Sequence, residues 1–363
     1  MTRVQQCLLI VCVSFFTFCG WTSVANSSLP NIENNLHSTV LVATKNVTPR
    51  LDETTHNMAP VPAPDITNPG MGTGIIMTDK GHIITNYHVV EKGNTISVWM
   101  YEDETMTEYD ATIVGFDKLS DIAVIKIDLP KNYNFKKVEW GRSPDYGDDI
   151  YVIGHPQGMI WSVSKGVVSH PKRFVTSPWQ TLIQSDALIM PGNSGGPLFD
   201  HHGDLVGINT LMILSRDPTA KTQAWAMSIH LDDVRWVYDR IIEYGRVRRP
   251  ALNIEVDFDV ENKLVKIKAG PDTALGKLGM KESYLLEIDG IEVKEYGDIF
   301  NYLRSKLDGD TAIIKVKELE SGEVKSLTFK LADWEALQSN KEKDKVLEKE
   351  EELEIPHGIP SPK

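Results

Sequence analysis

The sequence predicts a mainly β protein: a large antiparallel β-barrel or sandwich, followed by a smaller unit in which strands and helices mix. Short apolar or alternating runs, separated by turns rich in Gly, Pro, Asp and Asn, fill residues 39–229. This rhythm is typical of antiparallel β folds rather than of alternating β and α units. The hydrophobic period then becomes helical near residue 231, and both kinds of pattern recur from 251 to 333. With 363 residues, 41% of them apolar, the chain is long enough for two cores.

The strands of the first unit are expected at ten runs. These are residues 38–44, 73–78, 82–86, 95–100, 110–116, 121–127, 149–154, 166–169, 181–185 and 204–210. Residues 46–70 interrupt them with several prolines and little apolar pattern, which indicates a long surface loop.

A helix is expected to close the first unit. In LDDVRWVYDRIIEYG, apolar residues recur at helical spacing, two aspartates lie in the first turn, and Gly245 follows the end. Residues 246–250 form a basic connector that ends in proline. The second unit, 251–333, has five strand patterns and helical patterns near 273–279 and 297–306. The charged tail, 334–363, predicts a solvated helix or disorder with no implied function.

Residues 1–25 indicate an export signal. Arg3 precedes an apolar stretch from 8 to 18, and Ser23-Val24-Ala25 forms a small-residue cleavage site. We therefore expect a periplasmic or secreted protein, beginning near Asn26. The alternative is an uncleaved membrane anchor, because residues 8–25 lack charge over nearly the ~20 positions that span a bilayer. All three cysteines lie in this segment, so the mature chain would have no disulfide.

The composition argues against several classes of function. A net charge of −13, with no basic stretch interleaved with aromatics, disfavours a nucleic-acid binder. The glycines of GMGTG at 70–74 continue as a strand pattern, which disfavours a dinucleotide loop. His201-His202 has no third ligand at a recognisable spacing, so a hairpin turn is favoured over a metal site. We expect no metal and no cofactor.

The stretch IMPGNSGGPLFD, residues 189–200, surrounds Ser194 with glycines. A serine hydroxyl becomes a nucleophile only with a base in hydrogen-bond reach, and the oxyanion that then forms needs converging donors. Gly192 and its neighbours free the backbone, so that the N–H groups of Gly192 and Ser194 can face one point. A glycine-rich hairpin turn is the alternative explanation of the glycines alone.

Two further stretches favour catalysis over the turn. His88 lies in GHIITNYHVV after a strand pattern, and Asp121 opens the strand pattern in LSDIAVIKI. Each residue alone is commonly structural. Together with Ser194 they follow the order His, Asp, Ser, which is one known solution of the serine-protease triad.

At these residues the chain resembles the HtrA (Deg) family of serine proteases. The matching segments are GMGTGIIMTDKGHIITNYHVV, DKLSDIAVIKID, YGDDIYVIGHPQG, GVVS, LIQSDALIMPGNSGGPL and GDLVGINT, which cover most of residues 70–230. The resemblance implies a trypsin-like double antiparallel β-barrel over residues 26–245. It also implies a small α+β PDZ domain over 246–333, where LEIDGIEV precedes a helical pattern with DIFNYL.

The resemblance also assigns roles. Ser194 would be the nucleophile, His88 the general base and Asp121 its orienting partner, with the oxyanion bound by the N–H groups of Gly192 and Ser194. Ile189 and the strand Thr210, Leu211 and Met212 would bind substrate. Leu188 stands where trypsin-like enzymes that prefer Lys or Arg carry a carboxylate, which implies a small or medium apolar residue before the cut. Trp225 would either narrow the pocket or pack in the core.

The function implied is ATP-independent cleavage of unfolded or misfolded polypeptides outside the cytoplasm, by a homotrimer. Leu252, Asn253 and Ile254 would form the PDZ loop that binds peptide C-termini. This loop lacks the family's usual glycine, and Asn253 tolerates left-handed backbone better than most residues. The alternative is a catalytically silent, PDZ-containing peptide-binding or chaperone-like protein.

Overall fold

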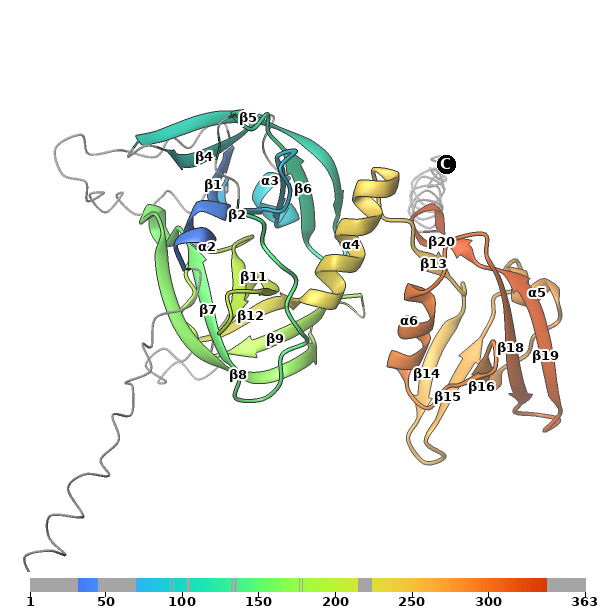
Figure 1. The fold of residues 1–363 in the computed structure, drawn as a ribbon. Coiled ribbons are helices and arrows are strands. Elements are labelled where there is room, and N and C mark those ends of the chain that lie inside the picture. The colour runs from blue at the N-terminus through green and yellow to red at the C-terminus, as the bar shows by residue number, and fades with distance from the viewer. Residues whose placement is uncertain are drawn as a thin grey trace, which may run out of the picture.

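The computed structural model describes residues 32–44, 70–214 and 224–337, apart from positions 92, 94, 103, 104, 132, 134, 135, 176 and 178. The predicted export signal, the loop at 46–70 except Gly70, and the tail beyond 337 lie outside the described residues. Two β-barrels form one body, and a mixed α/β domain lies on the far side of helix α4 (Figure 1). The prediction of a mainly β chain with a double antiparallel barrel is confirmed.

The first barrel closes in the order β1-β2-β3-β6-β5-β4. Its strands are β1 Thr39–Thr44, β2 Met71–Ile76, β3 His82–Thr85, β4 Ile96–Glu102, β5 Thr105–Asp117 and β6 Ile122–Lys126. Helix α2, Ile32–Ser38, leads into β1, and the single turn α3, Tyr87–Val90, follows β3. The barrel is filled by β-branched residues that alternate toward its axis, such as Val40, Val98 and Ile125.

The second barrel closes in the order β10-β11-β12-β9-β8-β7. Its strands are β7 Asp149–Gly154, β8 Ser162–Phe174, β9 Thr181–Ser185, β10 Pro197–Asp200, β11 Leu205–Leu214 and β12 Ala224–His230. The 3-10 turn η1, Pro156–Gly158, follows β7. Strands β10 and β12 are not among the ten predicted runs; β10 has only four residues and includes Pro197 and Asp200, which are typical of turns.

Helix α4, Leu231–Tyr244, lies where the helical period predicted it. Its N-cap is His230, whose side chain accepts from the N–H of Asp232. It ends at Gly245, which has the left-handed φ of 71° that a helix C-cap favours. The apolar face of α4 packs on both barrels through Val234, Val237 and Ile241.

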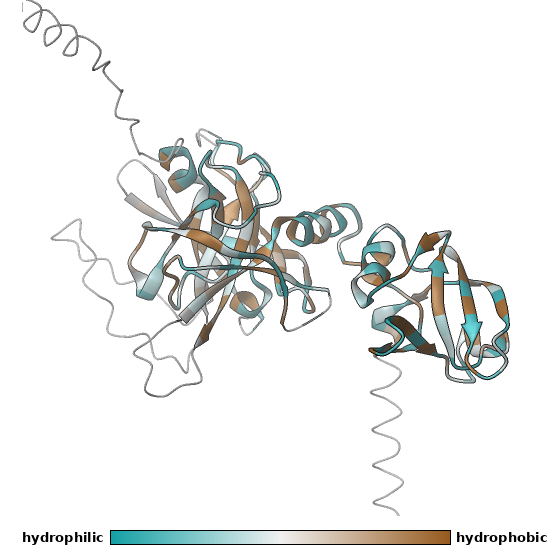
Figure 2. Ribbon diagram, turned by 90° about the horizontal axis from the view of Figure 1, so that it is seen from below, coloured by the Kyte–Doolittle hydropathy of each residue, from teal (hydrophilic) through white to brown (hydrophobic). Residues whose placement is uncertain are grey.

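The second domain is built on a sheet of order β14-β15-β16-β18-β19, with β17 beside β16. The strands are β14 Glu255–Asp259, β15 Leu264–Lys268, β16 Ser283–Ile288, β17 Ile291–Glu292, β18 Thr311–Glu318 and β19 Val324–Lys330. A separate pair joins β13 Pro250–Ala251 to β20 Ala332–Asp333, and the helices are α5 Ala274–Lys277 and α6 Tyr296–Arg304. Apolar and polar residues alternate along the strands of the sheet (Figure 2), and the buried apolar residues of α6 pack with those of the sheet in one core. Within the described ranges, no helix is both long and apolar enough to cross a membrane.

Candidate active site

His88 and Asp121 meet at the rim of the first barrel. His88 lies in α3, just after β3, and Asp121 directly precedes β6. His88 Nδ1 lies 2.7 Å from Oδ2 of Asp121, and the main-chain N–H of His88 donates to Oδ1 at 3.0 Å. Because a carboxylate only accepts, the proton is on Nδ1, and Nε2 is left with its lone pair as a base.

The backbone of Asp121 is held in an uncommon conformation. Its φ is 57°, a left-handed value that costs free energy for a residue with a Cβ. Its carbonyl accepts from the Asn86 side chain at 2.8 Å and from the Tyr87 N–H at 3.2 Å. These two donors hold the strained residue in place and aim its carboxylate at His88.

Thr210 connects Asp121 with Ser194. It lies in β11 at a bulge between Asn209 and Leu211. The Thr210 hydroxyl donates to Oδ2 of Asp121 at 2.7 Å, and the Thr210 carbonyl accepts from the Ser194 hydroxyl at 3.3 Å. Within the described residues, His88 makes no hydrogen bond to Ser194. The contact between base and nucleophile is open here, as it often is in enzymes without substrate.

The Gly192 and Ser194 amides are available as oxyanion donors. Neither N–H donates a hydrogen bond within the described part of the chain. Gly192 has a φ of 105°, and a Cβ added there would lie 2.3 Å from the carbonyl oxygen of His155. Only glycine fits at this position, which explains why the sequence motif has glycine there.

A cavity of about 190 Å³ opens beside Ser194. Its walls include all four residues predicted to bind substrate, Ile189, Thr210, Leu211 and Met212. Leu188 does not line it and is 66% exposed, so the apolar character of the cavity comes from Ile189 and Met212 instead. Both expectations for Trp225 are wrong, because this side chain is 43% exposed on β12 and lines neither the cavity nor the core.

Comparisons with known proteins agree with this geometry. A sequence profile of the "Trypsin-like peptidase domain" family matches residues 72–208. "Protease Do-like 1, chloroplastic" of Arabidopsis thaliana is 32% identical over 285 residues, which are 72% of this chain and 63% of that protein. "Serine protease Do-like HtrB" of Bacillus subtilis is 32% identical, over 70% of this chain and 60% of that protein. The solved "HtrA-type protease AlgW with decapeptide" is 26% identical with a TM-score of 0.68, covering 83% of this chain and 97% of that one.

The chain belongs to the HtrA family. It spans between about one third and two thirds of the length of the curated relatives it matches. Within this HtrA chain, the profile match covers β2 to β11 and includes His88, Asp121 and Ser194.

The predicted peptide loop of this HtrA chain lies in the second domain between β13 and β14. Asn253 has the left-handed φ of 51° expected of a residue that replaces glycine there. Leu252, Asn253 and Ile254 line a cavity of about 180 Å³ between the loop and α6. The protease domain itself closes part of this cavity, because Trp179 also lines it and is only 3% exposed.

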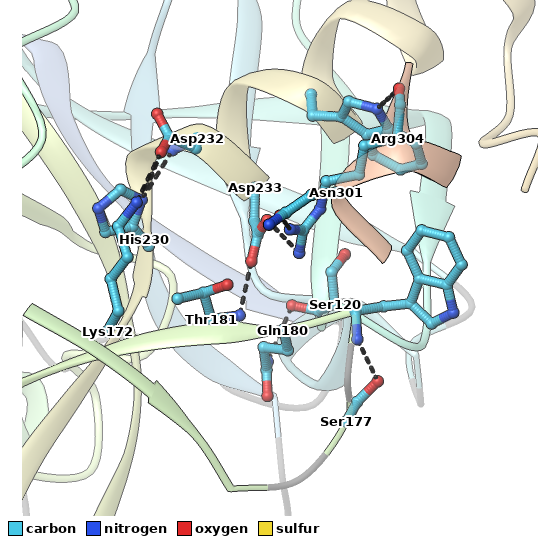
Figure 3. A network of polar contacts seen from close by, with 12 residues as sticks. Ser120, Lys172, Ser177, Gln180, Thr181, His230, Asp232, Asp233, Asn301 and Arg304 are labelled. Carbon is cyan, nitrogen blue, oxygen red and sulfur yellow. Dashed lines mark hydrogen bonds and ion pairs between the residues drawn. The ribbon is translucent and has the colours of Figure 1, made fainter. Parts of the chain in front are cut away.

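A polar network joins the two domains at the same place (Figure 3). Arg304 of α6 pairs with Asp233 of α4 at 2.8 Å, and the other oxygen of Asp233 accepts from the Thr181 N–H at 2.6 Å. Next to Thr181, the Gln180 side chain donates to the Ser120 carbonyl at 3.0 Å. Burial raises the pKa of Asp233, although the charge of Arg304 opposes the shift. These contacts connect α6 with Ser120, the residue that precedes Asp121.

The sequence did not reveal the role of Arg249. It was assigned to a basic connector, yet it is 1% exposed and forms a bidentate ion pair with Asp117, four residues before Asp121. Asp117 also accepts from the N–H of Ser120 at 2.9 Å. In the sequence, Arg249 is only a charged residue directly before a proline in a short connector. Nothing in that pattern points to Asp117, which lies 132 positions away.

Proposed function

We propose that this HtrA-family chain is an ATP-independent serine endopeptidase that cleaves unfolded or misfolded polypeptides outside the cytoplasm. One observation carries the proposal. The Asp121 carboxylate orients His88, and Thr210 joins the same carboxylate to Ser194, beside two amides that have no acceptor in the described part of the chain.

The mechanism follows from these positions. The Ser194 hydroxyl turns from the Thr210 carbonyl to His88, and Nε2 takes its proton as Oγ attacks the peptide carbonyl. Asp121 stabilises the imidazolium, and the N–H groups of Gly192 and Ser194 bind the oxyanion. His88 then protonates the leaving amine, and water, activated by the same imidazole, releases the acyl group.

The cavity supports a preference for a small or medium apolar residue before the cut. Its volume of about 190 Å³ and the side chains of Ile189 and Met212 suit such a residue, and none of the described residues that line it is charged. We infer that substrate pairs in extended form with β11 at residues 210–212, which requires locally unfolded polypeptide.

The test is replacement of Ser194 by alanine. Wild-type protein is expected to degrade casein and to be labelled by a fluorophosphonate probe, whereas Ser194→Ala does neither. Equal casein turnover by the two proteins would refute the proposal. Peptide libraries would then report the residue before the cut.

A second candidate is a catalytically silent peptide-binding or chaperone-like protein. It is favoured by one observation, the donation of the Ser194 hydroxyl to Thr210 rather than to His88. The same probe separates the candidates, because only an activated serine reacts. Absence of labelling together with suppression of aggregation of an unfolded protein would support the silent alternative.

We further propose that the second domain is a PDZ domain that binds peptide C-termini at Leu252, Asn253 and Ile254, and that the protein is an exported homotrimer. Support comes from the left-handed Asn253, the loop cavity and the resemblance to HtrA proteins. Relatives named "Probable periplasmic serine endoprotease DegP-like" support export to the periplasm. Light scattering after gel filtration tests the trimer, and cell fractionation with N-terminal sequencing tests export and cleavage.

A further inference from the structure

The loop that carries the predicted oxyanion donors is fixed through its carbonyl groups. Each of the four consecutive carbonyls from Pro191 to Ser194 accepts a hydrogen bond. In chain order the donors are Gln157 N at 2.8 Å, Thr73 Oγ1 at 2.7 Å, Gly196 N at 3.0 Å and Thr73 N at 2.8 Å. In a trans peptide the C=O of one residue and the N–H of the next point in opposite directions. The bonds to the Pro191 and Asn193 carbonyls therefore set where the Gly192 and Ser194 amides point, and the bond to the Gly192 carbonyl fixes the 192–193 peptide plane that joins them.

Thr73 of β2 supplies two of the four donors. Its main-chain N–H bonds the Ser194 carbonyl, and its hydroxyl bonds the Gly192 carbonyl. The side chain is fully buried where β2 of the first barrel faces the end of β7 of the second. Among the donors that the described residues provide to these carbonyls, only the Thr73 hydroxyl belongs to a side chain. It is therefore the contact that a substitution can remove without altering the backbone.

His155 completes the hydrogen bonding of this hydroxyl. Its Nδ1 lies 3.1 Å and its main-chain N 3.2 Å from Thr73 Oγ1. A hydroxyl has one proton and two lone pairs. Because the Gly192 carbonyl takes the proton, Nδ1 must donate to Oγ1, and the main-chain N–H of His155 fills the second lone pair. The imidazole thereby prevents the Thr73 proton from turning away from Gly192.

The environment of Nε2, the other ring nitrogen of His155, is consistent with a proton on Nδ1. Nε2 is buried and has no hydrogen-bond partner among the described residues, as expected of a bare lone pair. The ring packs edge-to-face against Trp161 at 5.4 Å. Burial lowers the pKa of His155 to about 3, so the ring stays neutral at working pH.

We propose that Thr73 and His155 are positioning residues for the oxyanion loop: the Nδ1–H tautomer of His155 commits the Thr73 hydroxyl to the Gly192 carbonyl. This bond fixes the 192–193 peptide plane, which lies between the Gly192 and Ser194 amides, and so keeps both amides in the productive orientation. The inference rests on the proposed protease function. It also predicts a tautomer, which is observable without any turnover.

Four variants test the hydrogen bonds from His155 through Thr73 to Gly192, which we call the relay, with a chromogenic peptide substrate. Thr73→Val keeps the shape and loses the hydroxyl, and Thr73→Ser keeps the hydroxyl. An asparagine side chain places its amide nitrogen near the position of Nδ1, whereas that of glutamine lies nearer Nε2, so His155→Asn restores the donor and His155→Gln does not. We expect kcat to fall about 10- to 100-fold in Thr73→Val and His155→Gln, with little change in KM. This decrease is smaller than the ~10²–10³-fold loss of kcat that follows removal of an oxyanion donor itself. Thr73→Ser and His155→Asn recover most of this loss.

The control is Thr39→Val, which removes a buried hydroxyl that donates to the Asn35 carbonyl at the same 2.7 Å and that is not bonded to Thr73, His155 or the loop at 191–194 within the described residues. It should lower the thermal midpoint as Thr73→Val does, with kcat retained. Equal loss of kcat in the control, or equal kcat in His155→Gln and His155→Asn, would overturn the proposal.

The tautomer is measured in the Ser194→Ala protein by ¹⁵N-detected imidazole NMR, with His155 assigned by its absence in His155→Asn. A protonated Nδ1 supports the relay, and a protonated Nε2 overturns it. If wild-type protein is inactive and unlabelled, the protease proposal fails, while this measurement still decides the tautomer.

Discussion

The Thr210 hydroxyl donates a 2.7 Å hydrogen bond to the same oxygen of Asp121 that accepts from His88. Oδ1, the other oxygen, accepts from the His88 main chain. The carboxylate therefore has three donors, two from α3 of the first barrel and one from β11 of the second. The orientation of the proposed base depends on how the two barrels meet.

Removing the Thr210 hydroxyl is expected to slow the reaction without displacing the residues. A hydrogen bond to a charged group contributes about 1.5–3 kcal/mol, so Thr210→Val should lower kcat/KM by roughly 10- to 100-fold if Asp121 is mainly needed in the transition state. Thr210→Ser keeps the hydroxyl and should recover most of the rate. Steady-state kinetics on a peptide substrate measure both. A loss in Thr210→Ser as large as in Thr210→Val would assign the effect to the cavity wall instead.

The buried pair between Arg249 and Asp117 should be a point of high sensitivity to mutation. Removing one partner of a buried ion pair costs about 3–5 kcal/mol, because the other charge is left without compensation. We expect Arg249→Met to lower the free energy of unfolding by that amount, measured by urea denaturation in the Ser194→Ala background. The double variant with Asp117→Leu should recover part of it. Arg246→Met, at an exposed position of the same connector, is the control and should change stability little.

The fold was predictable where burial alternates along the chain. Strands such as β18 show every second residue buried, and α4 has an apolar stripe with a cap at each end. Strand β10 was missed because it has only four residues and includes Pro197 and Asp200, which are typical of turns. The fold was thus predictable in outline, but not in a short strand with the composition of a turn.

The site was predictable only as far as its motifs reach. The sequence singled out Ser194, Gly192, His88 and Asp121, because nucleophile chemistry requires these residue types. It gave no indication of Thr73 and His155, which look like an ordinary strand residue and turn residue until folding brings them together across 82 positions. Arg249 was missed for the same reason: a contact between distant segments leaves no local pattern.

Acid should destabilise the protein through His230. Burial lowers its pKa to about 4, and the charges of Lys172 and Arg304 add to the shift while that of Asp232 opposes it. Nδ1 accepts from the Asp232 N–H at the start of α4, so a proton on this nitrogen removes the cap. The unfolded chain, with an ordinary histidine pKa near 6.5, binds a proton that the folded chain does not. Stability is therefore complete above pH 6.5 and falls by about 1.4 kcal/mol per unit as the pH drops from 6.5 toward 4. His155, with a pKa of about 3, adds a parallel loss.

Urea denaturation of Ser194→Ala protein between pH 4.5 and 7.5 measures this slope. His230→Asn supplies an N-cap acceptor that does not titrate in this range, so its slope should be shallower by one proton. His201→Asn, in the exposed turn between β10 and β11, should leave the slope unchanged. An equal slope in His230→Asn and its parent would contradict the assignment.

Trp179 should control access to the cavity at the peptide loop of the second domain. The indole lies perpendicular to Phe300 with ring centres 5.0 Å apart, and stacks on Trp236 at 6.0 Å, so it packs between α6 and α4. It lines the cavity of Leu252 and Ile254, where the apolar end of a bound peptide would lie under our proposal. The protease domain thus places its own side chain at the position that a ligand would need.

Replacing Trp179 by alanine has two expected results. Removal of so large a buried side chain should destabilise the contact between the domains by about 3–5 kcal/mol. It should also raise the affinity for a fluorescein-labelled peptide with an apolar C-terminal residue, measured by anisotropy in the Ser194→Ala background, because the cavity is no longer partly closed. Trp225→Ala removes an indole that is 43% exposed and lines no part of this cavity, so it is the matched control and should leave affinity unchanged. Unchanged or weaker peptide binding in Trp179→Ala would show that the indole is a structural support of the loop rather than an obstacle to a ligand.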